Sequence, residues 1–364
     1  MNEDHPQISP SLYFFLIFTP LVSFSLLFYP NTLAQTIGTD GYLGIPVALF
    51  FVLPVIFLGR YFERRFSGRT IIEYAPLILG KFWGLIYNLV YLIFLLIIVF
   101  VLLRELTGLV SHFLLLHTPI WADALLIVGS IGYLSYYGLS PTARLATFLL
   151  PAGVFIFFMI GLGFQNWNLQ NAIPILRQPV KTYLLGGFKS LYIFYPLVLV
   201  YQTSAFSNQK QKNTPLALAA LALAGAIYFF NMLGIMGVFG PENCIRYNWP
   251  TLEYVRAINF PYLLLDQIGL TLIIAWLVEA YATGTILTFF ISSGVSQLWK
   301  KLSFKKVTLM LIPVYFFSLI SFPNHDLLRD LFGYFQIIGI IVLLGLPVLL
   351  WLVSLITERR DGKL

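Results

Sequence analysis

The stretch NWPTLEYVRAINFP, residues 248–261, is a short amphipathic segment in an otherwise apolar chain. Glu253 and Arg256 stand three residues apart between apolar neighbours, although 59% of the 364 residues are hydrophobic and only 10% are charged. A soluble domain of this size needs far more charge to cover its surface. We therefore expect the stretch to form a helix that lies in a membrane interface, with its Tyr and Trp side chains at the depth of the lipid headgroups.

The hydrophobic runs around this stretch predict an all-α polytopic membrane protein. Runs of roughly 20 apolar residues recur, and a helix of that length crosses a hydrocarbon core of ~30 Å. We expect a single membrane domain, residues 1–364, surrounded by the lipid bilayer. The first run follows a segment without Lys or Arg, so we interpret it as an uncleaved span and not as a secretory signal. The ten expected spans are residues 12–35, 42–59, 82–113, 120–138, 142–163, 183–206, 215–239, 262–292, 307–322 and 328–356.

Lys and Arg are concentrated in alternate loops. Clusters at 60–69, 300–306 and 359–363 fall on one side of the ten spans, and the loops on the other side carry fewer positive charges. Because positively charged loops stay in the cytoplasm, this pattern places both termini there. The net charge of +7 is then mainly a topology signal, and no nucleic-acid binding is expected. The single cysteine, Cys244, excludes an internal disulfide and is expected in an outer loop.

A second amphipathic stretch, TIIEYAPLILG at residues 70–80, matches the first in pattern. Ile-Glu-Tyr at 72–74 corresponds to Leu-Glu-Tyr at 252–254, and each triplet lies between the second and third spans of a five-span half. The halves, residues 12–163 and 183–356, then cross the membrane in opposite directions, which is the plan of transporters with inverted repeats. The alternative is a chance match combined with a common need for interfacial helices.

The first span carries the features of a broken helix. In inverted-repeat transporters the first span of each half is broken at mid-membrane, and the exposed helix ends bind the substrate. Pro20 and Pro30 bracket Ser23, Phe24 and Ser25 here, and proline removes a backbone donor and crowds the preceding turn. These three bracketed residues are predicted to contact a ligand. The alternative is a kink or packing notch of the kind that membrane helices often contain.

The sixth span has matching features. Gly186 and Gly187 lie early in it and Pro196 follows later, so we expect the sixth helix to be broken as well. The alternative is again a kink or a packing notch. The glycine pair, Lys189 and Tyr192 are predicted to form the opposing wall of the ligand site. For Lys189 the alternative is a side chain that snorkels to the outer surface, and for Tyr192 it is a core aromatic.

Glu279 is the acidic residue predicted to lie deepest in the membrane. It follows Asp266 by 13 residues, which is roughly 20 Å along a helix. A carboxylate at that depth is costly unless it faces a cavity, pairs or becomes protonated. We predict a proton site or a ligand contact, with Thr283 one turn further on and partly on the same face. The alternative is a hydrogen-bonded packing residue.

Arg104 and Glu105 stand near the outer end of the third span. We predict a gating or coupling role for them, and the alternative is an arginine that snorkels outward. His112 and His117 lack Cys, Asp or Glu at ligand spacing, so no metal site and no cofactor are expected. The sequence has no GxSxG, HExxH or P-loop pattern. These absences exclude an ATP-driven pump on this chain alone and argue against an enzyme.

The opening stretch also carries a resemblance to a known family. PTLEYVRAI at 250–258, followed by LLLDQIGLTLIIAW at 263–276, resembles the signature region of the endospore germination permeases. GKFWGLIYN at 80–88 and HTPIW at 117–121 are similar landmarks in the expected order, so the resemblance covers nearly the whole chain. That family comprises the B subunits of spore germinant receptors, within the amino acid–polyamine–organocation superfamily. Ser23 and Ser25 stand where the family commonly has glycines.

The resemblance implies a receptor subunit with a transporter-like fold. Such a subunit binds a small nutrient, an amino acid or a similar germinant, and it signals to a larger membrane A subunit and a lipoprotein C subunit in the spore inner membrane. The alternative is an ion-coupled amino-acid secondary transporter. Both proteins need the same pocket, and they differ in whether net flux occurs and whether partners are required.

Overall fold

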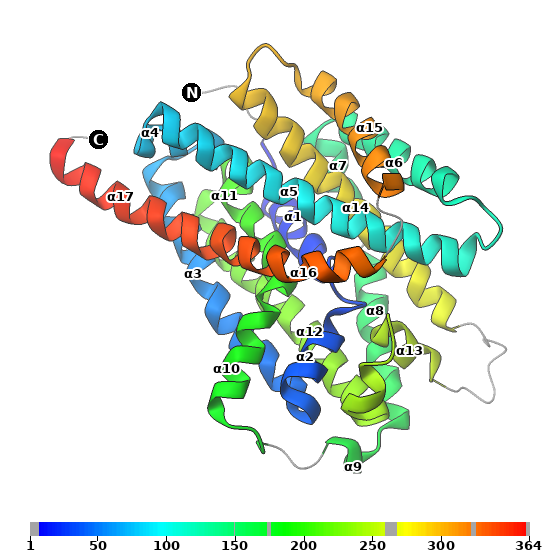
Figure 1. The fold of residues 1–364 in the computed structure, drawn as a ribbon. Coiled ribbons are helices and arrows are strands. Elements are labelled where there is room, and N and C mark those ends of the chain that lie inside the picture. Colours follow the sequence, from blue (N-terminus) through cyan, green and yellow to red (C-terminus); the bar gives the residue numbers. More distant parts are fainter. Residues whose placement is uncertain (1–6, 149, 173–175, 259–267, 322–324, 362–364) are drawn as a thin grey trace.

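Helices form almost all of the described chain (Figure 1). The structure is a computed structural model, and it describes residues 7–148, 150–172, 176–258, 268–321 and 325–361. Within these residues the β-type pairing is one isolated bridge between Ile8 and Ser207. The all-helical expectation is therefore confirmed.

The described part of the first half contains eight α-helices. Their bounds are α1 (Pro10–Ser23), α2 (Tyr29–Ile37), α3 (Gly44–Arg65), α4 (Ile71–Leu79), α5 (Lys81–Leu109), α6 (Ile120–Tyr136), α7 (Leu139–Phe148) and α8 (Leu150–Leu162). A 3₁₀ segment, η1 (Gly38–Leu43), joins α2 to α3, and a π-helical turn, η2 (Val110–Leu114), extends α5.

The second half begins with α9 (Leu169–Ala172) and a span that changes helix type. The span consists of α10 (Val180–Lys189), the 3₁₀ segment η4 (Ser190–Leu199) and α11 (Val200–Thr203). The elements that follow include, in chain order, η6 (Lys210–Lys212), α12 (Asn213–Cys244), α13 (Pro250–Arg256), α14 (Ile268–Leu298), α15 (Phe304–Ser321), α16 (His325–Ile340), η7 (Ile341–Gly345) and α17 (Leu346–Asp361).

Where the structure describes the chain, helices occupy the ten expected spans; residues 262–267, the start of the eighth expected span, lie outside the described residues. Among the described residues, seven continuous helical stretches are long and apolar enough to cross a membrane, and three shorter apolar helices, Pro10–Ser23, Ile120–Tyr136 and Gly153–Asn166, overlap the first, fourth and fifth expected spans. A polytopic membrane protein with about ten membrane helices is thus confirmed. The positions of the repeats, residues 12–163 and 183–356, stay a prediction.

Both amphipathic stretches form short helices in corresponding places. Thr70 and Glu73 form a capping box at the start of α4, and Pro250 starts α13, where its missing N–H costs no hydrogen bond. The helix α4 packs against α5, and α13 packs against α14. Each short helix therefore packs against the long helix that follows it, which is the arrangement expected from the paired sequence pattern.

The first and sixth spans are broken, as predicted. After α1 ends at Ser23, a turn covers residues 24–28 before α2 begins at Tyr29. Pro30 stands in the first turn of α2, a position where its fixed backbone angle suits the helix. In the sixth span, α10 passes into the 3₁₀ segment η4, which contains Pro196.

The two broken spans occupy the centre of the bundle. Every residue from 15 to 27 and from 190 to 207 is buried, and α1 packs against α12, α14, α7 and η4. Figure 1 shows α6 and α15 side by side at one edge of the molecule, where α15 leaves many apolar side chains exposed. Apolar exposure on an outer helix suits a lipid-facing surface, so the polar chemistry is concentrated inside.

Candidate functional site

The end of α1 is joined to α14 by side-chain hydrogen bonds. The hydroxyl groups of Ser23 and Thr283 lie 2.6 Å apart, and the indole N–H of Trp276 donates to the Ser23 carbonyl oxygen at 2.9 Å. All three residues are buried. The last carbonyl groups of a helix lack partners within the helix. Trp276 of α14 therefore supplies a hydrogen-bond donor to a carbonyl group at the end of α1 that the break leaves without a partner in its own helix.

Tyr228 of α12 shares its one hydroxyl proton between two further carbonyl groups of α1. Its hydroxyl group lies 2.7 Å from the carbonyl oxygen of Leu21 and 3.1 Å from that of Val22, and it is also 3.2 Å from the Ser25 hydroxyl oxygen. Tyr228 is fully buried. A buried carbonyl without a partner costs about 1–3 kcal/mol, so this tyrosine stabilises the break in its present form.

The helix α13, formed by the amphipathic stretch around Glu253, also contacts the break. The hydroxyl of Thr251, in α13, donates to the Leu26 carbonyl at 2.6 Å and accepts from the Asn231 side chain at 2.7 Å. The Asn231 amide also reaches the Tyr29 hydroxyl at 3.2 Å. Sequence reasoning missed Thr251 and Asn231, because nothing in the local pattern connects them to a turn some 200 residues earlier.

Glu279 lies one helical turn before Thr283, at the meeting point of α1, α8 and α14. The Thr19 side chain and the Gly153 backbone hydrogen-bond to its carboxyl group. A Cβ atom at Gly153 would lie 3.3 Å from Oε1 of Glu279, so the glycine allows this close approach. Oε2 is buried, and no described residue hydrogen-bonds to it. This oxygen can therefore accept a proton or bind a cation.

Gly186 and Gly187 do not join this polar group. A Cβ atom at Gly187 would collide with the Val47 side chain and lie 3.2 Å from the Ala48 backbone nitrogen, and one at Gly186 would collide with Ile37. The glycine pair thus lets α10 approach α2 and α3 closely. This placement matches the packing notch that the sequence left open as an alternative.

The two other predicted residues of the sixth span have different surroundings. Tyr192 is buried, with its hydroxyl 2.9 Å from that of Thr32, and its ring stacks on Phe28 at 6.2 Å between centroids. Lys189 is exposed, and its backbone carbonyl accepts from the Gln336 side chain at 3.1 Å. Tyr192 therefore contacts the broken first span, whereas the Lys189 side chain points away from the buried centre.

Four aromatic rings pack beside the break, and we call them the aromatic cluster: Phe24, Phe94, Tyr195 and Phe335. Phe335 of α16 lies 6.4 Å from Phe24, 6.1 Å from Phe94 and 5.3 Å from Tyr195 between ring centroids. All four side chains are buried. The cluster therefore forms an apolar group of buried rings that includes Phe24 of the break.

Arg104 and Glu105 lie near the junction of α5 and α13. The Trp249 indole N–H donates to Oε2 of Glu105 at 2.9 Å, and only 2% of Arg104 is exposed. The arginine therefore does not snorkel to the surface. Glu105 thus joins α5 to Trp249, the residue directly before the helix that contacts the break. Among the described residues, no group of three or more His, Cys, Asp or Glu has the proximity that a metal site needs.

The broken first and sixth spans and the paired short helices define a membrane protein with a transporter fold. The structure of MhsT in complex with L-phenylalanine is similar, with a TM-score of 0.68 at 13% identity, over 93% of this chain and 87% of that one. A substrate-bound, outward-open Na⁺-coupled sialic acid symporter is also similar, with a TM-score of 0.64 at 15% identity, over 94% of this chain and 78% of that one. At these identities the likeness shows the fold.

The chain belongs to the spore permease family of spore germination proteins, whose sequence profile matches residues 7–327. It is 26% identical to spore germination protein YndE of Bacillus subtilis (strain 168), over 95% of this chain and 96% of that protein. Spore germination protein B2 of the same organism is 24% identical over 96% and 95%. GerQB of Bacillus cereus is 22% identical over 96% of each chain. The resemblance seen in the sequence is confirmed, and the family consists of permease- or receptor-like membrane proteins.

Proposed function

We propose that this chain is the membrane subunit of a spore germinant receptor and that it binds a small nutrient, an amino acid or a similar compound, at the break between α1 and α2. One observation carries the proposal. The break lies at the buried centre, and hydrogen bonds from Tyr228, Trp276 and Thr283 hold it to α12 and α14. A ligand that replaces these contacts changes how the long helices pack. The difference between its affinity for the present packing and its affinity for the changed packing sets the size of the response.

The two sides of the break suit the two parts of an amino acid. The helix α2 begins just beyond Ser25, and a helix N-terminus favours a carboxylate through its partial positive charge. The aromatic cluster offers an apolar wall for the rest of the ligand. Phe24 is fully buried, so ligand entry requires the rings to separate, and a movement of α16, which carries Phe335, accomplishes this.

In this proposal, ligand binding at the break signals to other proteins. A larger A subunit and a lipoprotein C subunit in the spore inner membrane are the partners that membership in the germination family favours. The loop charges favour a topology in which both termini of this chain lie in the cytoplasm. Binding at the break then changes the packing of α12 and α14 at surfaces that a membrane partner can contact.

The second candidate is an ion-coupled amino-acid secondary transporter. The observation in its favour is Glu279, whose Oε2 is buried without a hydrogen-bond partner among the described residues. A buried carboxylate needs a proton or a cation to offset its desolvation. Since Thr283 lies one turn further along α14 and contacts Ser23, occupancy of Glu279 is communicated to the break over a short distance.

A comparison of binding with flux separates the two functions. The purified chain is tested for binding of radiolabelled amino acids and then, in proteoliposomes, for their uptake with and without a proton or Na⁺ gradient. The receptor proposal predicts binding without net uptake, and germination that requires the A and C subunits. Sustained uptake by the chain alone establishes the transporter instead. Failure to bind any amino acid or related nutrient contradicts both.

A further inference from the structure

A recess at the end of α3 lies apart from the break and is lined by positive charge. It has a volume of about 490 Å³ and is formed by the last turns of α3, by η6 and by the start of α12. This volume is within the range of about 300–1,000 Å³ that is usual for small-ligand pockets. The cationic side chains of the recess are Arg60, Arg64 and Lys210.

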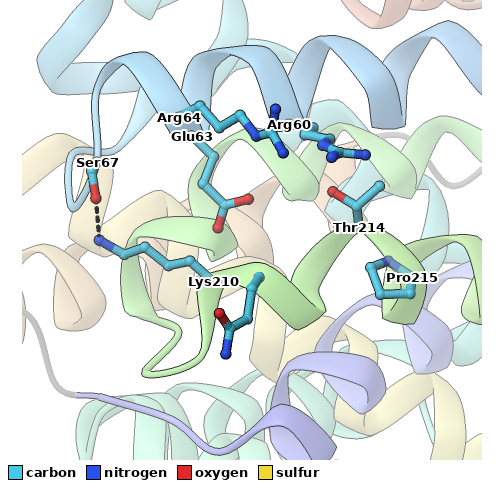
Figure 2. A pocket seen from close by; sticks show the side chains of 8 residues that line it. Arg60, Glu63, Arg64, Ser67, Lys210, Thr214 and Pro215 are labelled. Atoms are coloured by element: carbon cyan, nitrogen blue, oxygen red, sulfur yellow. Dashed lines mark hydrogen bonds between the residues drawn. The ribbon is translucent and has the colours of Figure 1, made fainter.

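The two walls of the recess are fixed to each other by hydrogen bonds. The Asn213 side chain donates to Oε1 of Glu63 at 2.5 Å, and the Lys210 ammonium donates to the Ser67 hydroxyl at 2.7 Å. Figure 2 shows Glu63 pointing from α3 toward the segment that carries Lys210. Residues about 150 positions apart in the chain are thereby held around one space.

Glu63 has a structural partner of its own. Asn213 is the first residue of α12, and an acidic group at a helix N-terminus is stabilised by the helix dipole. All three cations act electrostatically on Glu63, but none forms an ion pair with it among the described residues. The cations therefore remain available to another anion.

The charge and geometry of the lining select the class of ligand. Three cations and one acidic residue leave an excess of at least two positive charges. The guanidinium groups of Arg60 and Arg64 match the oxygen geometry of a phosphate, and the hydroxyls of Ser67 and Thr214 add further donors. We propose that this recess binds a phosphate group, carried either by a lipid headgroup or by a soluble anion. The site is separate from the ligand site at the break and does not depend on the proposed receptor function.

The test compares two double variants of the full-length chain that remove equal charge. Arg60→Gln with Arg64→Gln alters the recess, and Lys300→Gln with Lys301→Gln removes two exposed cations from another loop on the same predicted side. Both arginines are exposed, so their replacement is expected to leave the fold intact. Inorganic phosphate is titrated against the protein in neutral detergent at constant ionic strength. Phosphatidylglycerol is titrated into phosphatidylcholine nanodiscs.

The expected result is phosphate or phosphatidylglycerol binding by the parent, weakened by about tenfold or more in the recess variant and unchanged in the lysine variant. Response to phosphate alone identifies a soluble anion, and response to phosphatidylglycerol alone identifies a headgroup. Glu63→Gln keeps an oxygen for Asn213 but removes a negative charge, so it should tighten binding. Equal weakening in both double variants, or no binding of either probe by the parent, overturns the proposal.

Discussion

The two broken spans of this protein are built differently. The break in the first span is an open turn whose polar groups are bonded to other helices, through Ser23 and Thr283 and through Tyr228. The break in the sixth span is a buried 3₁₀ segment, and the glycine pair before it serves close packing. The two breaks therefore differ in their contacts: hydrogen bonds join the first break to other helices, and close packing of glycines against neighbouring helices accompanies the second.

The largest expected effect is at the sixth span. In Gly187→Leu the new side chain collides with Val47 and crowds the Ala48 backbone, and such overpacking costs about 1–3 kcal/mol or more. We expect little folded protein in membranes and no ligand response. The measurement is the amount of monodisperse protein after extraction in mild detergent.

Gly129→Leu is the matched control for the sixth span. A Cβ atom at Gly129 meets nothing within 4 Å, so this variant should accumulate like the parent. If Gly187→Leu is also fully folded but loses ligand binding, the sixth span contributes to the ligand site directly and the comparison between the two breaks fails.

The second prediction concerns Glu279, beside the first break. Glu279→Gln keeps an oxygen for Thr19 and Gly153 but fixes a neutral group. We expect normal folding and assembly, with loss of most of the ligand response or of its dependence on pH. Glu279→Leu also removes the acceptor and shows whether the site only needs to be filled. Ligand binding and germination are titrated against pH, and parental behaviour of both variants at every pH identifies Glu279 as a packing residue.

Tyr228→Phe should have a smaller effect, confined to the first break. The change leaves the Leu21 and Val22 carbonyl groups without their donor, at a cost of about 1–3 kcal/mol in the present state. Thermal unfolding should occur at a lower temperature and the ligand affinity should change. Tyr254→Phe removes one hydroxyl bonded to the Ile160 carbonyl, so it should destabilise the fold without changing ligand affinity. Equal ligand affinity in all three proteins contradicts a role for Tyr228 in the switch.

The smallest expected effect separates two buried serines. Ser23→Ala removes the contact with Thr283, which links two helices, whereas Ser190→Ala removes a hydroxyl that bonds only to the Gly186 carbonyl of its own helix among the described residues. A single hydrogen bond contributes about 0.5–1.5 kcal/mol. We expect ligand affinity to change severalfold in Ser23→Ala and not in Ser190→Ala. The opposite pattern in a binding titration would assign the switch to the sixth span.

The sequence was sufficient for the fold because the fold depends on features that are local in the chain. Apolar runs set the spans, and Pro20 and Pro30 mark the first break whatever tertiary contacts these two residues make. The short helices at Thr70 and Pro250 follow from capping chemistry and an amphipathic pattern. Each of these signals lies within a few residues of the element that it predicts, so no tertiary contact is needed to recognise it.

The candidate site was predicted less completely, for a physical reason. Tyr228 and Phe335 reach the break from helices far away in the chain, and an aromatic residue in a membrane helix has no periodic signal that separates a contact from packing. Glycine is equally ambiguous, so the sequence did not show that Gly187 faces α3. Cys244 was expected in an outer loop, but it is the last residue of α12 and is fully buried.

The hydrogen bond from Thr251 to the Leu26 carbonyl limits how the helix α13 can evolve. Surface connections usually tolerate added residues. One residue inserted inside α13, directly after Thr251, would turn the rest of this helix by about 100° relative to Thr251. Thr251 would then leave the break, or α13 would leave its place on α14. Related chains should therefore vary in composition here more readily than in length.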